Sequence, residues 1–221
     1  MRPERTAISL VVADDHPIVL EGIVRVLESE SDFEICASCQ NGADAIRAIQ
    51  HHRPNVAVLD IVMPDMTGLE VLAQMNSEGS ETNVIFLTAN ASDAHILAVI
   101  EQGAKGLLLK DTAISDVARC VRSVAEGARI FPVDLVNAAI ERETGRRSVG
   151  EQLERTLSVR EREVVLLVAE GLPNKEVARR LNLSEGTVRI HVHNIYQKTG
   201  IASRAALTAL ALTHRDVLLR S

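Results

Sequence analysis

The sequence has very few aromatic residues: they make up 2% of its 221 residues, and there is no tryptophan. Any hydrophobic core must therefore be built from aliphatic side chains. The hydrophobic fraction of 46% is sufficient for such a core, and the length suits two domains of ordinary size.

Cysteines and long apolar runs are also scarce. The three cysteines are an odd number. Residues 37–38, between Cys36 and Cys39, lie in a predicted strand with no helix start after them, which argues against a redox pair. We therefore expect reduced thiols and a cytoplasmic protein. No apolar run approaches the ~18 residues of a membrane span. Residues 1–5 lead into a strand without the apolar stretch of a signal peptide.

Positive charge is scarce in the first two thirds of the chain. The net charge is -6, but residues 151–221 carry about +3 and the preceding residues about -9. An asymmetry of this kind suggests a C-terminal part that faces nucleic acid. The positive excess is small, so charge alone does not identify a nucleic-acid partner.

Strand-like and helix-like patterns alternate between residue 7 and about residue 127. The predicted strands are 7–13, 33–38, 55–60, 83–88 and 105–109, and the predicted helices are near 17–29, 42–51, 68–77, 93–102 and 112–126. Five such repeats predict an α/β fold with a doubly wound, five-stranded parallel sheet and helices on both faces. The crossovers should be right-handed.

The pattern changes after residue 128. Phe131-Pro132 can start a helix, whereas residues 143–152 are polar, contain glycine and lack an apolar period, so we predict an exposed linker there. From residue 153 the pattern is all helical. Ser158, Pro173, Ser184 and Ser203 begin four predicted helices, with Glu161 completing a capping box. The predicted division is thus 1–128, a helix and linker at 129–152, and a four-helix domain at 153–221.

Polar side chains follow the ends of four predicted strands: Asp14, Asp15, Asp60, Thr88 and Lys110. In parallel sheets these ends line the ligand crevice. Three close carboxylates repel unless a cation joins them, and oxygen ligands suit Mg²⁺. Asp60 could then act as a nucleophile toward a phosphoryl group, with Lys110 and Thr88 stabilising its charge. Each residue alone could be an ordinary surface group, but that explanation fits all five poorly.

The helix that begins after Ser184 has two distinct faces. Val188, Ile195 and Thr199 can pack inward, whereas Arg189 could bind a guanine edge and Ile190 a thymine methyl. A helix preceded by a short turn and another helix predicts a helix-turn-helix. The alternative is an amphipathic bundle that binds protein.

The N-terminal pattern is carried by four segments: VADDHP (12–17), LDIVMPDMTG (59–68), TA (88–89) and GAKGLLLK (103–110). Together they resemble the receiver domain of two-component response regulators, a flavodoxin-like fold. The resemblance implies that Asp60 accepts phosphate from a sensor histidine kinase and that Thr88 and Lys110 contact the phosphoryl group. It further implies Mg²⁺ ligands, namely Asp15 and Asp60 directly, Asp14 mainly through water, and the Val62 carbonyl.

Two positions near the site, 107 and 16, have no role assigned by these motifs. Receivers usually carry an aromatic residue three positions before the lysine, whereas this sequence has Leu107, so the resemblance does not extend to the aromatic part of the switch. His16 follows the acid pair and is either a neighbour of the metal or phosphate or, as we favour, a residue packed at the start of the first helix.

The C-terminal segments 157–164, 171–178, 181–191 and 198–204 look like a LuxR-type DNA-binding domain. With the receiver, they resemble the NarL/FixJ family of response regulators. The resemblance implies that Arg189, Ile190 and His193 read bases. Candidate phosphate-backbone contacts are Asn174, Lys175, Ser184, Thr187, Lys198 and Arg204. His191 has either a structural or a DNA-contacting role. The small-residue face around Ala205, Ala206 and Ala209 is either core or a dimer interface.

We therefore expect a transcription regulator rather than an enzyme. Its expected partners are a sensor histidine kinase, promoter DNA and a second copy on phosphorylation or DNA binding, with RNA polymerase a further candidate. A Mg²⁺-dependent phosphohydrolase would need an aspartate at position 62, which is Val62. A small-molecule-gated LuxR-type activator would need an N-terminal pocket rich in aromatic residues, which this composition does not supply.

Overall fold

The structure is a computed structural model that describes residues 7–89, 91–111 and 114–219. The chain forms two compact units, Met1–Ile140 and Glu141–Ser221. The expectation for residues 1–5 and the predicted helix start at residue 112 lie outside the described residues. No helix in the described part is long and apolar enough to cross a membrane.

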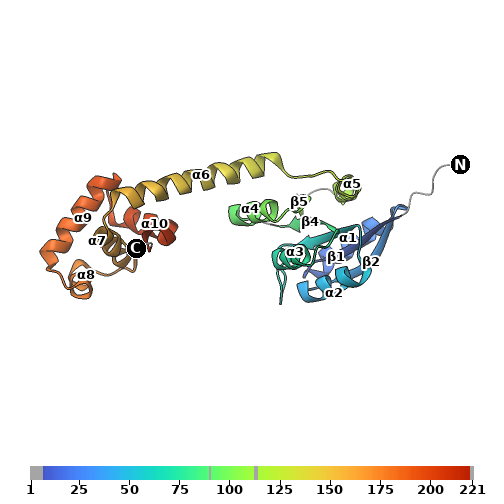
Figure 1. Ribbon diagram of the computed structural model, residues 1–221, viewed down its shortest axis with the longest axis horizontal. Helices are drawn as coiled ribbons and strands as arrows, with labels where there is room; N and C mark the ends of the chain where they lie inside the picture. The colour runs from blue at the N-terminus through green and yellow to red at the C-terminus, as the bar shows by residue number, and fades with distance from the viewer. Residues whose placement is uncertain (1–6, 90, 112–113, 220–221) are drawn as a thin grey trace. The chain divides into compact units, whose positions relative to one another are not determined.

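The first unit contains a five-stranded parallel sheet in the order β2-β1-β3-β4-β5 (Figure 1). Its strands are β1 Ile8–Ala13, β2 Phe33–Cys39, β3 Val56–Asp60, β4 Asn83–Thr88 and β5 Gly106–Leu109. Each overlaps its predicted strand, because short apolar runs rich in Val, Ile and Leu are typical of strands buried on both faces. The three cysteines are free, and Cys36 and Cys39 lie in β2 as expected.

Helices cover both faces of this sheet, as predicted. They are α1 Pro17–Glu28, α2 Gly42–His52, α3 Gly68–Ser77, α4 Asp93–Glu101 and α5 Ile114–Ala125. Successive strand residues point to opposite faces, so Val11 packs in the core under α2, α3 and α4, whereas Leu10 and Val12 pack under α1 and α5. The doubly wound architecture is confirmed.

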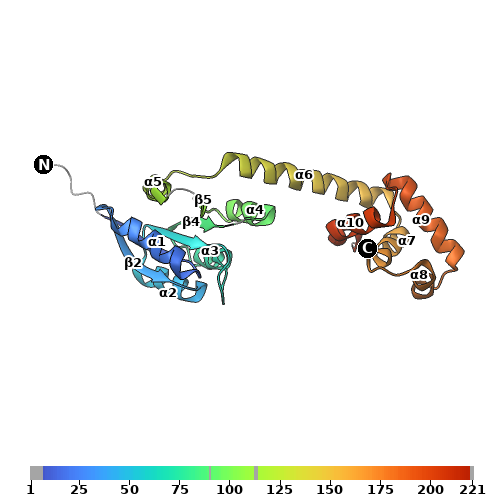
Figure 2. The same ribbon diagram turned by 180° about the vertical axis from the view of Figure 1, so that it is seen from behind.

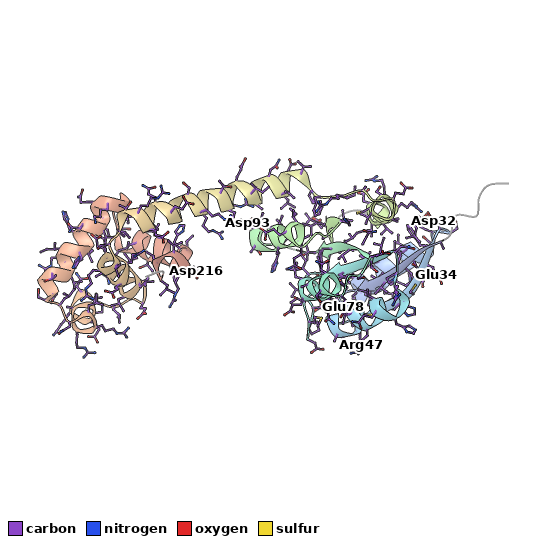
Figure 3. All side chains as sticks on the ribbon, viewed as in Figure 1. Asp32, Glu34, Arg47, Glu78, Asp93 and Asp216 are labelled. Atoms are coloured by element: carbon purple, nitrogen blue, oxygen red, sulfur yellow. The ribbon has the colours of Figure 1, made fainter. Side chains whose placement is uncertain are left out.

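An ion-pair cluster ties α5 to the loop before β2. Arg122 donates to both carboxylate oxygens of Asp32, at 2.7 and 2.9 Å, and pairs with Glu30. The same guanidinium lies over the ring of Phe33 at 4.8 Å. Asp32 is labelled in Figure 3. This contact fixes α5 on the side of the sheet that it shares with α1.

The chain after α5 extends the sheet at its β5 edge. The Leu107 N–H donates to the Ile130 carbonyl at 2.9 Å, and the Ile130 N–H donates to the Lys105 carbonyl at 2.8 Å. Helix α6, Val133–Thr156, then begins. Its Ala139 is fully buried in the core that contains Leu107. The first turns of α6 therefore belong to the core of the first unit.

The predicted linker at 143–152 is wrong in its conformation, because these residues lie within α6. Glu143 pairs with Arg146 and Arg147, three and four positions further along. Such pairs stabilise a helix that has no apolar stripe. The absence of an apolar period therefore did not imply an irregular chain. The division into residues 1–128, 129–152 and 153–221 stays a proposal.

The second unit is helical, as predicted (Figure 2). After the end of α6 it contains α7 Val159–Ala169, α8 Asn174–Leu181, α9 Glu185–Thr199, α10 Arg204–Thr213 and α11 Arg215–Leu218. The short α11 was not predicted separately from the fourth helix. The core is aliphatic and includes Val168, Val177, Val188, Ile195 and Leu207.

Candidate phosphoacceptor site and nucleic-acid interface

The sheet register brings the predicted site residues to the same edge. Asp60 pairs with Leu87 and Thr88 pairs with Leu109, so the ends of β3, β4 and β5 lie side by side. Gly68, at the start of α3, is closely packed there: a Cβ on it would lie 2.2 Å from the Asp60 carbonyl oxygen. The site therefore depends on a glycine that lets α3 approach the end of β3.

Lys110 joins two buried carboxylates. Its Nζ lies 2.6 Å from Asp60 Oδ2 and 2.7 Å from Asp14 Oδ2. Asp14 is 1% exposed and Asp60 is 5% exposed. A buried charge requires a partner of this kind. The ammonium is thus held where it could neutralise negative charge added at Asp60.

Electrostatics set Asp60 apart from an ordinary surface aspartate. Burial raises the pKa of its carboxyl, and Asp14 adds to that rise, while hydrogen bonds from Lys110 and the Val62 N–H oppose it without cancelling it. Burial lowers the pKa of Lys110, but its contacts with Asp14 and Asp60 outweigh burial and leave this pKa raised. The charged forms of Asp60 and Lys110 therefore stabilise each other.

The acid cluster is suited to a divalent cation. Ligand atoms from Asp14, Asp15, His16 and Asp60 all lie within 4.8 Å of one another. Asp14 Oδ2 and Asp15 Oδ1 are buried and make ion-pair contacts but no hydrogen bond. Oxygen atoms with unshared lone pairs fit Mg²⁺. The ligand role predicted for the Val62 carbonyl stays a prediction.

Thr88 and Leu107 complete the surroundings of the site. Thr88 ends β4 and is buried. Leu107 lies in β5 and is fully buried, so an aliphatic side chain occupies the position where receivers usually carry an aromatic residue. Its backbone N–H is the group that binds Ile130.

His16 differs from the packed residue that we favoured. Its side chain is 66% exposed, and Nδ1 lies 2.7 Å from Asp15 Oδ1 and 3.3 Å from Asp14 Oδ1. It precedes α1 but makes no side-chain cap hydrogen bond. The packed reading is therefore wrong, and His16 lies beside the acids.

The second unit presents α9 as predicted. Helix α8 ends at Leu181, and the following Asn182 turns the chain with a φ of 53°. Ser184 then caps α9 by accepting a hydrogen bond from the Thr187 N–H. Val188 and Ile195 are buried, whereas the candidate base readers Arg189, Ile190 and His193 are exposed. An N-terminal helix face carrying such groups suits the DNA major groove.

Five of the six predicted phosphate contacts are engaged within the protein: Ser184 and Thr187 bond to each other at the start of α9, and three others make more distant contacts. Lys198 Nζ lies 2.7 Å from Glu161 Oε2, and Arg204 donates to Asn174 Oδ1 at 3.2 Å and to the Leu172 carbonyl. Lys175 is exposed, as is Ser184. Lys175 is therefore better placed than Lys198 to offer a free charge to DNA.

Sequence reasoning identified Glu161 only as half of a capping box. In the structure it is 4% exposed and accepts hydrogen bonds from Ser158 and Lys198. It thereby joins the start of α7 to the end of α9. The signal that could have revealed this pair is a lone lysine near the end of an otherwise weakly charged helix.

The fold and the two sites together define a signal-receiving domain joined to a helix-turn-helix domain.

Comparison with known proteins finds two family matches along the chain. Residues 10–122 match the family described as response regulator receiver domain, and residues 155–211 match the bacterial regulatory proteins of the luxR family. The chain is 34% identical over 213 residues to the nitrate/nitrite response regulator protein NarP of Escherichia coli (strain K12), covering 96% of this chain and 98% of NarP. It is equally similar to a probable transcriptional regulatory protein NarL of Mycobacterium tuberculosis (strain ATCC 25618 / H37Rv), with 96% and 97% covered.

Solved structures agree along the chain. The response regulator ChrA of a heme-sensing two-component system is 32% identical, with a TM-score of 0.56 and coverage of 95% of this chain and 98% of ChrA. An RcsB–DNA complex gives 25% identity, a TM-score of 0.58 and coverage of 94% and 99%. The chain therefore belongs to the NarL/FixJ family of two-component response regulators, with a receiver domain and a LuxR-type DNA-binding domain.

Proposed function

We propose that Asp60 is the phosphoacceptor of this response regulator and that its phosphorylation by a sensor histidine kinase controls DNA binding by residues 153–221. The observation that carries the proposal is the buried Asp60 carboxylate held by Lys110 beside Asp14. A strand-end carboxylate next to a fixed ammonium can both attack a phosphoryl group and retain it.

The chemistry uses few groups. A carboxylate oxygen of Asp60 attacks the phosphorus of a phosphohistidine or of acetyl phosphate, and the bond to the leaving group breaks as the acyl phosphate forms. Lys110 offsets the added charge, and the Thr88 hydroxyl donates to a phosphoryl oxygen. Asp14, Asp15 and Asp60 would hold Mg²⁺, which supplies further charge neutralisation when bound.

The β5 edge offers a route from Asp60 toward α6. Thr88 pairs with Leu109 in the sheet, and Leu107 on the same strand holds Ile130 through its backbone. A phosphoryl group on Asp60 favours the conformation in which its contacts with Thr88 and Lys110 are strongest, and so raises the population of that conformation. The shift needs no aromatic side chain at Leu107, because the link to Ile130 is made by the backbone.

At the DNA, Arg189, Ile190 and His193 would read bases. Lys175, Ser184 and Thr187 would contact phosphates, with Lys198, Asn174 and Arg204 contributing where their internal contacts allow. We expect binding as a homodimer to two half-sites, as other dimeric helix-turn-helix proteins bind.

The test starts from a pool of random duplexes, because the target sequence is not defined by the chain. Full-length protein treated with acetyl phosphate and Mg²⁺ selects its preferred duplex, and affinity for that duplex is then measured with and without acetyl phosphate. We expect acetyl phosphate to tighten binding by the wild type and to leave Asp60→Asn unchanged. Equal tightening in both proteins would refute control through Asp60. Steady release of inorganic phosphate without any effect on DNA binding would favour the phosphohydrolase alternative.

A further inference from the structure

His16 has a position that the proposed chemistry does not use. Its Nδ1 lies 2.7 Å from Asp15 Oδ1, and it offers a ligand atom within 4.8 Å of those of Asp14, Asp15 and Asp60. Opposite ligands of an octahedral ion lie about 4.2 Å apart, since each metal–oxygen bond is about 2.1 Å. The imidazole is thus close enough to share one coordination sphere with the carboxylates after a small movement.

The main chain at His16 is fixed, whereas its ring is mostly exposed and pairs only with the neighbouring acids among the described residues. The His16 N–H donates to Asp14 Oδ1 at 2.9 Å, and Pro17 follows as the first residue of α1. The ring caps no helix, joins no hydrophobic cluster and is mostly exposed. Its ion pairs are with Asp14 and Asp15, which are both candidate metal ligands.

We propose that His16 is a nitrogen ligand at this site and that it raises the site's preference for first-row transition cations over Mg²⁺. The proposal rests on the proposed function, because it assumes that Asp14, Asp15 and Asp60 hold a divalent cation. Imidazole suits transition cations, whereas Mg²⁺ favours oxygen ligands and retains its waters. A histidine beside three carboxylates should therefore strengthen binding of a cation such as Co²⁺ and leave binding of Mg²⁺ nearly unchanged.

The experiment compares Co²⁺ and Mg²⁺ affinities of full-length proteins by calorimetry, together with the visible absorption spectrum of bound Co²⁺. The test variant is His16→Asn, which keeps a small polar side chain at this exposed position. The matched control is His52→Asn, which removes an exposed histidine at the end of α2 that is outside the acid cluster. His16→Gln is a second test variant in case the first folds poorly.

We expect the ratio of Co²⁺ to Mg²⁺ affinity to fall about tenfold in His16→Asn. Mutation of an outer-shell residue alone lowers metal affinity by at least about tenfold, so the loss of a direct ligand should have an effect of this size or more. The Co²⁺ spectrum should change in the same variant, and neither quantity should change in His52→Asn. An unchanged ratio and spectrum in both His16 variants would overturn the proposal, while Mg²⁺-dependent phosphorylation of the wild type would leave the proposed function intact. Absence of binding by either cation to the wild type would overturn both.

Discussion

Replacement of Glu161 by alanine should destabilise the DNA-binding domain by about 2 kcal/mol. The Glu161 carboxylate accepts hydrogen bonds from the Ser158 N–H and hydroxyl, each at 2.8 Å, and from Lys198 at 2.7 Å. Without this carboxylate the Ser158 N–H loses its acceptor in the capping box, which costs about 1 kcal/mol, although the Ser158 hydroxyl still caps the backbone of residue 161. The ion pair adds about 1 kcal/mol at most, because Lys198 is 40% exposed and solvent screens it. Glu161→Gln keeps an acceptor for Ser158 and should cost only about 1 kcal/mol.

The measurement uses the one tyrosine of the chain. Tyr196 lies in α9, and there is no tryptophan, so tyrosine fluorescence during urea unfolding reports on the DNA-binding domain rather than on the receiver. A double-mutant cycle with Lys198→Met isolates the pair. A coupling energy near zero between the two positions, or a loss in Glu161→Ala below about 0.5 kcal/mol, would refute the reasoning.

The same residue predicts a dependence on pH. Burial pushes the pKa of Glu161 upward, but hydrogen bonds from Lys198 and Ser158 outweigh burial and leave the pKa below that of an ordinary glutamate. A carboxylate whose pKa is depressed by folding stabilises the folded state. This contribution is complete above the pKa of the unfolded chain, about 4.3, and is lost as the pH falls through the pKa of the folded state. The stability difference between wild type and Glu161→Gln should therefore shrink below about pH 4. A constant difference would contradict this.

Five further variants test the two sites. Asp15→Ala should weaken Mg²⁺ binding more than Asp14→Ala does, because direct ligation matters more than ligation through water; equal dissociation constants would argue against the assignment. Gly68→Ala should prevent normal assembly of the site, because its Cβ would meet the Asp60 carbonyl oxygen at 2.2 Å, and a wild-type melting temperature would show that this approach can relax. Arg189→Ala should reduce the DNA-binding free energy by about 1–3 kcal/mol through one base position. Lys175→Ala should instead weaken binding to all DNA sequences alike and reduce the salt dependence of binding. The opposite pattern would mean that α9 presents a different face to DNA.

The strands and the strand-end residues could be predicted because the signal is local. Short apolar runs that end in Asp60 or Thr88 indicate buried parallel strands, and parallel strands bring their ends together. The caps at Ser158 and Ser184 were also visible, since a capping residue lies within three positions of its partner.

Features set by distant residues could not be predicted in the same way. Glu161 and Lys198 are 37 positions apart, and Arg204 reaches Asn174 across 30. No sequence period connects such pairs. The helix over 143–152 was missed for another reason: its support comes from charged pairs rather than from an apolar stripe.

The most direct test of the whole interpretation is phosphorylation of Asp60 itself. Full-length wild type and Asp60→Asn are incubated with acetyl phosphate and Mg²⁺, and intact-mass measurement counts the phosphoryl groups that each protein gains. We predict that the wild type gains one phosphoryl group and that Asp60→Asn gains none. The added group should be acid-labile and should be removed by hydroxylamine, as expected for an acyl phosphate. An equal gain by Asp60→Asn would contradict the assignment of Asp60 as the phosphoacceptor.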